Sequence, residues 1–275
     1  MKTRVVSGAV LVVLLVATLL SGGYVTAGVL LLVSLVGYHE LVSALGVNNG
    51  EKGFNIIEIL GLIAVVAYYG LTVAFGGDMK YLVMTLMFLF FAEAIVFVFS
   101  FPKYHSKQLI AAVFSFIYAP VMLSFIYLLR IMPNGQFLAW LPFIAWICDT
   151  FAYFAGRAFG KHKLCQKLSP KKTVEGAIGG IVGSVVAGAV FGYVYAVNTG
   201  SAAVSQDIIA FMLITLVAGA LSQIGDLIAS GIKRDHDIKD YGHLIPGHGG
   251  IMDRFDSVIF ITPVIFFMAM MLLNV

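Results

Sequence analysis

The stretch that decides the fold class is "YLVMTLMFLFFAEAIVFVFS", from Tyr81 to Ser100, which carries a single charged residue, Glu93. A helix needs about 20 mostly apolar residues to cross the hydrocarbon core of a bilayer. The whole chain shares this character: of its 275 residues, 60% are hydrophobic and 11% are charged, and the mean hydropathy is +0.99. Soluble domains average about 25% charged residues. The composition therefore predicts an all-α, polytopic integral membrane protein.

Nine stretches are long and apolar enough to be predicted as membrane spans. They are residues 5–21, 24–45, 54–75, 81–100, 109–130, 137–156, 174–197, 207–230 and 257–275. The first has an alternative reading as a signal peptide, because Lys2 and Arg4 precede it. Its apolar core is long, however, and a second span follows almost at once, so we favour nine spans.

Lys and Arg concentrate in alternate loops. If the N-terminus is cytoplasmic, the segments on the cytoplasmic side, here called the inside segments, are 1–4, 46–53, 101–108, 157–173 and 231–256. These segments contain every Lys and Arg of the chain except Lys80 and Arg130. Cytoplasmic loops carry such an excess of basic residues. The pattern predicts a cytoplasmic N-terminus, a C-terminus on the outside and a location in the cell membrane. The net charge of only +3 gives no indication of nucleic-acid binding.

Polar residues are concentrated in the C-terminal half of the chain. We predict that residues 1–135 form a transmembrane scaffold and that residues 136–275 form a catalytic region with cytoplasmic loops 157–173 and 231–256. The seventh span has small residues at every fourth position, which predicts a face where neighbouring helices pack closely. These residues are Gly176, Gly180, Ser184, Gly188 and Gly192.

Acidic residues at membrane depth are candidates for function, because an ionised carboxylate there is unfavourable unless it is paired or bound to a cation. Asp149 and Asp226 lie near the predicted cytoplasmic ends of the sixth and eighth spans. Asp253 and Asp256 are three residues apart where the ninth span begins, so on a helix they share a face. Acidic residues in a first turn also complement the helix dipole. If these carboxylates converge, they form an oxygen site suited to Mg²⁺. For Glu93, a structural hydrogen bond and a functional role both stay open.

Two basic clusters lie in the richest loops. The first contains Ser169, Lys171, Lys172 and Thr173 and runs into the start of the seventh span, where free backbone N–H groups favour anions. The second contains Lys233, Arg234 and Lys239. Membrane topology alone places cations here, but it does not explain the accompanying Ser, Thr, Gly, His and Asp residues. The clusters indicate a polyanionic substrate, and the membrane setting suggests that one reactant is a lipid.

The "PGHGG" segment, Pro246 to Gly250, predicts a tight, irregular loop because glycine permits positive φ. His248 within it is placed to donate to a phosphate. The histidines lack the spacing of a zinc site, and the chain has no G-x-x-x-x-G-K-[ST] phosphate loop.

One long segment resembles a family signature. "SGIKRDHDIKDYGHLIPGHGGIMDRFD", from Ser230 to Asp256, is similar to the signature of phosphatidate cytidylyltransferases, also called CDP-diacylglycerol synthases. "SPKKTVEGAIGG" (Ser169–Gly180) and "CDTFAYFAGRAFGKHK" (Cys148–Lys163) resemble the central region of the same family. The resemblance is specific over about residues 148–257. It implies transfer of CMP from CTP to phosphatidic acid, giving CDP-diacylglycerol and pyrophosphate.

The resemblance also implies a paired-cation centre that requires Mg²⁺, with a monovalent ion such as K⁺ as a candidate for the second cation. Asp226 and Asp253 match the metal-binding aspartates of the family, and Asp149 and Asp256 are neighbouring candidates. The basic residues and His248 would hold the triphosphate or the lipid phosphate, and Asp240 belongs to the signature. Membrane lipids are expected around the protein, and a homodimer is compatible with this picture.

Two other functions are alternatives. A transporter or channel would suit intramembrane carboxylates and glycine-rich helices. Against it, the polar residues cluster toward one face and no inverted repeat is visible. A transferase acting on CDP-alcohols would usually carry a D-G-x₂-A-R pattern, which this chain lacks.

Overall fold

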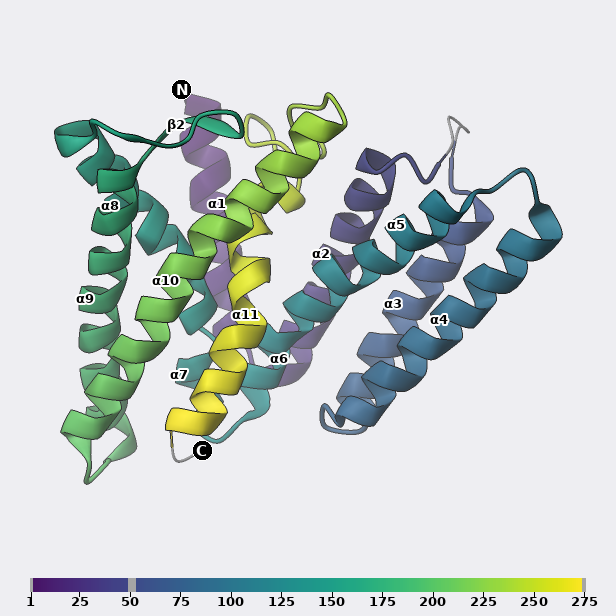
Figure 1. Cartoon of the computed structure of the whole chain (residues 1–275). Coiled ribbons are helices and arrows are strands. Elements are labelled where there is room, and N and C mark those ends of the chain that lie inside the picture. The colour runs from purple at the N-terminus through teal and green to yellow at the C-terminus, as the bar shows by residue number, and fades with distance from the viewer. Residues whose placement is uncertain (1, 49–52, 274–275) are drawn as a thin grey trace. The chain divides into compact units, whose positions relative to one another are not determined.

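The computed structural model describes residues 2–48 and 53–273. Residues 49–52 of the predicted inside segment 46–53, and 274–275 at the end of the ninth predicted span, lie outside the described residues. The elements, shown in Figure 1, are in chain order α1 (Lys2–Leu20), α2 (Gly23–Ala44), α3 (Ile56–Ala74), α4 (Met79–Ser100), α5 (Ser106–Phe116), η1 (Ile117–Val121), α6 (Met122–Ile131), α7 (Gly135–Leu138), η2 (Leu141–Phe143), α8 (Ile144–Phe159), β1 (Lys163–Cys165), β2 (Ser169–Thr173), α9 (Val174–Thr199), α10 (Val204–Asp235) and α11 (Met252–Leu272).

The long apolar helices follow the predicted spans. Within the described residues, eight helical segments are long and apolar enough to cross a membrane, and α1 contains a ninth, shorter apolar helix from Val6 to Leu20. One of the eight, Ser106–Ile131, joins α5, η1 and α6, and Pro120 lies in its π-helical turn. Proline removes a backbone donor and disturbs the regular α-helical pattern at that point. The predicted all-α membrane fold is confirmed.

The chain forms two compact units. Unit 1 comprises Met1–Leu128 and Asp235–Arg254, and unit 2 comprises Leu129–Arg234 and Phe255–Val275. In unit 1, α2 packs against α3, α5 and η1, and α3 packs against α4 (Figure 1). Buried hydroxyl pairs join these helices, such as Ser34 with Tyr69 at 2.8 Å. Such pairing satisfies polar groups that a membrane interior cannot hydrate.

Small residues allow the helices of unit 2 to approach closely. A Cβ on Gly180 would lie 2.8 Å from the carbonyl oxygen of Cys148 in α8, and one on Gly192 would lie 2.9 Å from Ile208 Cα in α10. The α9 helix therefore packs directly on the backbones of α8 and α10, and Figure 1 shows α8 and α9 side by side. The small-residue face predicted for the seventh span is confirmed.

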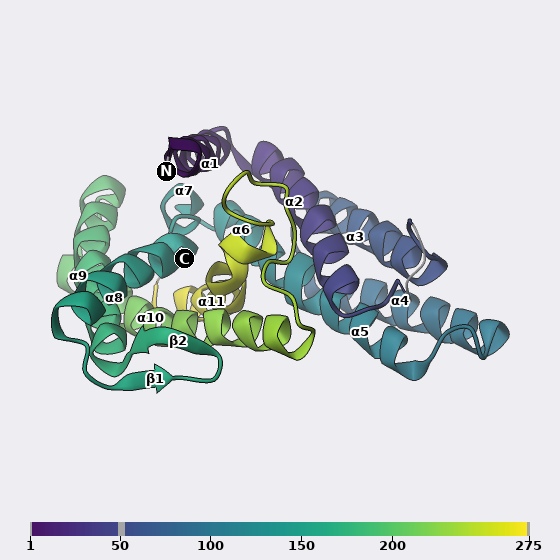
Figure 2. The ribbon, with the colours of Figure 1, turned by 90° about the horizontal axis from the view of Figure 1, so that it is seen from above.

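The basic segment 157–173 contains a short β-hairpin that the sequence did not indicate. Strands β1 and β2 pair antiparallel, with Lys163 opposite Thr173 and Cys165 opposite Ser169. Val174 N donates to His162 O at 2.9 Å, which fixes the hairpin against the start of α9. Figure 2 shows the hairpin from above. The strands are short and rich in lysine, so they lack the alternating apolar pattern by which strands are recognised.

The α10 and α11 helices each extend about five residues beyond the predicted spans on the side of the loop that joins them. The α10 helix continues to Asp235, so Lys233 and Arg234 lie in its last turn, where cations complement the helix dipole. The α11 helix already begins at Met252. Gly247 and Gly249 have φ values of 77° and 85°, which confirms the irregular glycine loop predicted before it. Asp253 therefore lies in the first turn of α11 rather than in a loop.

Candidate functional site

A polar cavity of about 420 Å³ lies in unit 2. Four elements contribute to its wall: α8, strand β2, the first turn of α9, and α10. The polar side chains that line it are Asp149, Tyr153, Arg157, Lys171, Lys172, Thr173, Gln223 and Asp226. Five of them were predicted from the sequence as site residues, namely Asp149, Lys171, Lys172, Thr173 and Asp226. The structure therefore brings together residues from three separate stretches of the C-terminal half.

An ion pair crosses this cavity. Lys172 Nζ lies 2.5 Å from Asp226 Oδ2, and the two side chains are 24% and 28% exposed. The pair joins the hairpin to α10. A half-buried pair is less screened by solvent than a surface pair, so each charge strongly influences the other. An entering phosphate would compete with Asp226 for Lys172, and a cation would compete with Lys172 for Asp226.

The start of α9 forms one side of the cavity. Thr173 is the N-cap residue, and its hydroxyl accepts a hydrogen bond from Gly176 N at 3.1 Å. Glu175 in the first turn accepts from Lys161 N at 3.0 Å and pairs with the ring of His162 at 2.6 Å. These contacts hold the segment before the hairpin against the helix. A helix N-terminus with Lys171 and Lys172 beside it favours bound anions.

A second carboxylate lies close to Asp226. The α10 and α11 backbones approach each other at Gly225, where a Cβ would lie 2.7 Å from Phe260 Cβ and 3.1 Å from Asp256 O. Asp256 is 8% exposed, and it interacts electrostatically with Asp226, Lys233 and Asp149. Gln223 Nε2 donates to Ala177 O at 2.9 Å and fixes α10 against α9. Helix packing thus gathers three aspartates within unit 2.

Aspartate carboxylates are the kind of ligand that suits a hard cation, because Mg²⁺ prefers oxygen ligands. Asp149 and Asp226 line the cavity, and Asp256 lies within electrostatic range of both. Within the described ranges, no group of three or more His, Cys, Asp and Glu side chains is placed to hold a metal ion by itself. Mg²⁺ commonly binds one or two carboxylates together with substrate phosphates and water, and the aspartates of unit 2 can provide those carboxylates.

Asp253 has a clear local role in unit 1. Its Oδ2 accepts hydrogen bonds from Tyr241 N at 2.8 Å and from Gly250 N at 3.0 Å, and the residue is 8% exposed. It therefore organises the loop between α10 and α11. Arg254 Nε adds a bond to His248 O at 3.0 Å. The predicted convergence of Asp253 with Asp226 stays a prediction.

The other predicted residues lie on the hairpin, on α10 and in the loop that follows it. Ser169 is half-buried at the start of β2, and Arg234 is exposed at the end of α10. In unit 1, Lys239 is exposed, and Asp240 and His248 are half-buried. Their roles with substrate stay predictions.

Sequence reasoning missed two buried carboxylates in unit 1. Glu40 in α2 accepts hydrogen bonds from the backbone of Ile251 and Met252, and Glu58 in α3 pairs with His39. Both lie inside predicted spans, so the criterion that selected Glu93 would have found them. For Glu93, the structural hydrogen bond that we considered is not formed within the described residues, because both of its buried carboxylate oxygens lack a partner there.

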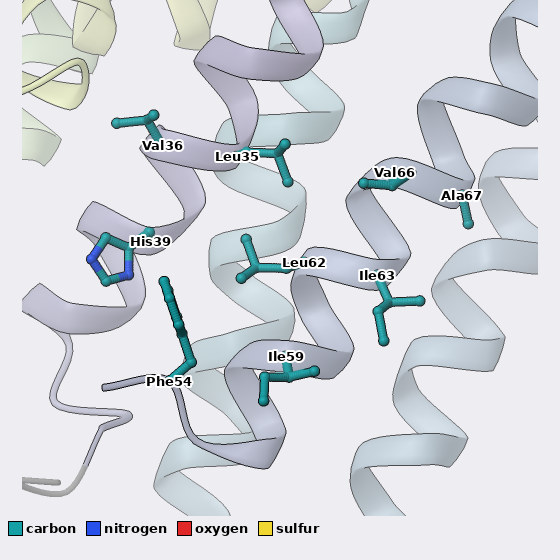
Figure 3. A pocket seen from close by; sticks show the side chains of 9 residues that line it. All are labelled: Leu35, Val36, His39, Phe54, Ile59, Leu62, Ile63, Val66 and Ala67. Atoms are coloured by element: carbon teal, nitrogen blue, oxygen red, sulfur yellow. The ribbon is translucent and has the colours of Figure 1, made fainter. Parts of the chain in front are cut away.

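A second cavity, of about 700 Å³, lies in unit 1 along α2 and α3. Figure 3 shows the His39 and Phe54 side chains near each other at one end of it, and their ring centroids are 5.2 Å apart. The remaining lining residues are apolar: Leu35, Val36, Ile59, Leu62, Ile63, Val66 and Ala67. Because His39 is the single titratable residue in this lining, the groove is poorly suited to a triphosphate. The polar cavity of unit 2 is therefore the candidate active site.

Comparisons with known proteins identify the family of this chain. The model of the cytidylyltransferase family matches residues 2–272. A protein named phosphatidate cytidylyltransferase from Staphylococcus epidermidis is 30% identical over 267 residues, covering 96% of this chain and 97% of the relative. One of the same name from Staphylococcus aureus is 28% identical over the same shares of both chains. A third, from Bacillus subtilis, is 39% identical over 125 residues, covering 46% of this chain and 44% of the relative. These similarities favour a transferase over a transporter or channel.

Proposed function

This chain belongs to the cytidylyltransferase family, and on that premise we propose that it is a phosphatidate cytidylyltransferase. It transfers CMP from CTP to phosphatidic acid and releases pyrophosphate. The observation that carries this proposal is the polar cavity of unit 2. There Lys171 and Lys172 lie beside the N-terminus of α9, opposite Asp149 and Asp226. Cations for phosphate and carboxylates for a metal ion thus line one cavity in a protein whose helices are apolar enough to span a membrane.

The reaction joins two anions. An oxygen of the lipid phosphate attacks the α-phosphorus of CTP, and a new P–O bond forms while the bond to the β-phosphate bridging oxygen breaks. The bonding electrons leave with pyrophosphate. Lys171 and Lys172 reduce the repulsion between the reactants and stabilise the charge that develops on the leaving group. A phosphate monoester is already nucleophilic near pH 7, so a strong general base is unnecessary.

Several further residues are proposed to hold phosphate. Thr173 and the first turn of α9 offer hydroxyl and backbone donors at the cavity. Lys233 and Arg234, on the last turn of α10, supply additional positive charge. We assign Ser169, Lys239, His248 and Asp240 to substrate binding on the strength of the family signature.

The proposed cofactor is Mg²⁺, with a second cation such as K⁺. When bound, Mg²⁺ neutralises phosphate charge and makes the α-phosphorus a better electrophile. Asp226 would be its main ligand from unit 2, with Asp149 and Asp256 as neighbours. Asp253, in the first turn of α11, is proposed as a further ligand on the strength of the family signature.

The chain is a membrane protein, as its apolar helices and its relatives indicate. We propose that it resides in the cell membrane with the active site facing the cytoplasm, because nearly all basic residues fall in the segments assigned to that side. The lipid substrate and product then stay in the bilayer. A homodimer among membrane lipids is the assembly that we propose.

The proposal is tested with purified protein in mixed micelles that contain phosphatidic acid, Mg²⁺ and CTP labelled at the α-phosphate. Label is expected in the lipid only when phosphatidic acid is present. CTP labelled at the γ-phosphate provides the control, because cytidylyl transfer leaves that label in pyrophosphate. Lipid labelling from γ-labelled CTP would indicate a kinase instead. No transfer from a folded preparation would refute the proposal, and competition with dCTP, ATP and UTP would define the base preference.

A further inference from the structure

Glu40 makes an unusual long-range contact. It lies in α2, is 5% exposed, and accepts hydrogen bonds from the backbone N–H groups of Ile251 at 3.1 Å and Met252 at 2.9 Å. These residues follow Glu40 by 211 and 212 positions, and all three belong to unit 1. Met252 is the first residue of α11. A carboxylate from one membrane helix thus binds buried backbone donors at the start of another.

The local sequence cannot supply this contact. The first N–H groups of a helix have no partner within the helix and are usually capped by a Ser, Thr, Asp or Asn side chain just before it. Gly249, Gly250 and Ile251 precede α11, and none of them has a side-chain acceptor. Glu40 provides the acceptor from elsewhere in the chain, and its negative charge also matches the positive end of the helix dipole.

The loop before α11 is closed around the same carboxylate. A Cβ on either Gly242 or Gly250 would overlap with Glu40 Oε1, so glycine is required for this close approach. Asp253 binds the neighbouring donors, Tyr241 N and Gly250 N. The buried carboxylates of Glu40 and Asp253 therefore each accept hydrogen bonds from two backbone N–H groups in the segment that leads into α11. Because Gly250 and Ile251 are adjacent, a displacement of the Glu40 carboxylate would also shift the backbone that is hydrogen-bonded to Asp253.

We propose that Glu40 is a positioning residue that fixes the start of α11 and so sets the orientation of Asp253, the metal ligand proposed from unit 1. This inference rests on the proposed function for its catalytic consequence, but the anchoring itself is independent of activity. Glu40 does not contact the reactants in this proposal. It acts through the backbone at Ile251 and Met252 and through the loop that Asp253 organises.

The test compares Glu40→Gln with Glu58→Gln. Both changes replace a buried carboxylate of unit 1 by an isosteric amide, but Glu58 pairs with His39, and among the described residues no hydrogen bond or ion pair joins its carboxylate to the loop. A glutamine at position 40 has one acceptor oxygen and would turn an NH₂ group toward a backbone donor. We expect hydrogen–deuterium exchange in the metal-free protein to increase for residues 241–252 in Glu40→Gln and to stay at the wild-type level there in Glu58→Gln.

Activity provides the second readout. A displacement of about 1 Å at a catalytic group lowers turnover by up to about 100-fold. Glu40→Gln should therefore lower kcat by about 10- to 100-fold and raise the Mg²⁺ concentration needed for half-maximal rate, while KM for CTP changes less than threefold. Glu58→Gln, at an equal change in melting temperature, should keep the Mg²⁺ requirement of the wild type.

Gly242→Ala tests the same contact from the loop side. Its methyl group should displace the Glu40 carboxylate, so the change should be damaging in the wild type but add little in a Glu40→Ala background. Additive effects, unchanged exchange in 241–252, or an unchanged Mg²⁺ requirement in Glu40→Gln would each overturn the inference. If the wild type shows no cytidylyl transfer, the proposed function fails, while the exchange experiment still decides whether Glu40 anchors the loop.

Discussion

The contact between α10 and α11 at Gly225 offers the sharpest prediction for catalysis. In Gly225→Ala, the new Cβ would lie 2.7 Å from Phe260 Cβ, 3.1 Å from Asp256 O and 3.3 Å from Ser257 Cα. Ordinary carbon–carbon contacts are about 3.5–4.0 Å. The two helices must therefore separate by about 1 Å at this point. Because two of the atoms are backbone and the third is a Cβ, rotation of a side chain cannot relieve the overlap.

The separation should lower both stability and activity. Overpacking of this kind destabilises a protein by about 1–3 kcal/mol. Since Asp226 follows Gly225 directly and Asp256 lies on the facing helix, the same shift alters the spacing of two proposed metal-site carboxylates. We expect kcat to fall by about 100-fold, which corresponds to about 2.7 kcal/mol in the activation barrier.

Gly231→Ala is the matched control, because it lies on the same helix and its Cβ would meet only Leu168 Cδ2 at 3.7 Å. It should keep wild-type turnover and gain slightly in stability, as alanine is favoured over glycine in a helix. The assay is transfer from α-labelled CTP to phosphatidic acid, with the melting temperature measured in the same detergent. If turnover of Gly225→Ala lies within threefold of Gly231→Ala, the link between helix spacing and catalysis is refuted.

Three further changes test other parts of the site. Lys172→Met should raise KM for CTP by about 10-fold, because it removes a cation from the cavity and leaves Asp226 without its ion-pair partner. An unchanged KM would exclude Lys172 from triphosphate binding. Asp253→Asn should abolish transfer, because it removes a proposed metal ligand. The melting temperature should change little, because the amide oxygen can still accept from Tyr241 N or Gly250 N. Near-normal turnover would contradict the metal role. Glu93→Leu should raise the melting temperature and leave kcat unchanged, because it removes two buried oxygens that lack a hydrogen-bond partner among the described residues. A lower melting temperature would instead show that this carboxylate binds a proton or cation that stabilises the fold.

The membrane helices were predictable because the signal is local. About 20 apolar residues in sequence are sufficient to define a span, and the structure has a helix at each predicted position. The ends were less predictable. Hydropathy falls at Lys233 and Arg234, but the helix continues through them because its C-terminus favours cations. The β1–β2 hairpin was missed because its strands are short and rich in lysine.

The candidate site was predictable as residue types but not as an arrangement. Asp226 and Lys172 were each selected for their chemistry and their place beside a span. Nothing in the local sequence indicates that they form an ion pair, because that contact depends on how β2 meets α10. Asp256 was selected as a neighbour of Asp253. Only the close approach of α10 and α11 at Gly225 shows that it lies within electrostatic range of Asp226.

By itself, the sequence determined the membrane class, the positions of the spans, the small-residue face of α9, the glycine loop before α11 and the chemistry of the candidate residues. These properties depend on hydropathy, on local backbone preferences and on residue type, all of which are encoded over short stretches. The tertiary structure decided which charges meet and which carboxylates are buried. Glu40 illustrates the difference: its place in an apolar span is visible in the sequence, but its partners lie more than 200 residues away and are set by helix packing.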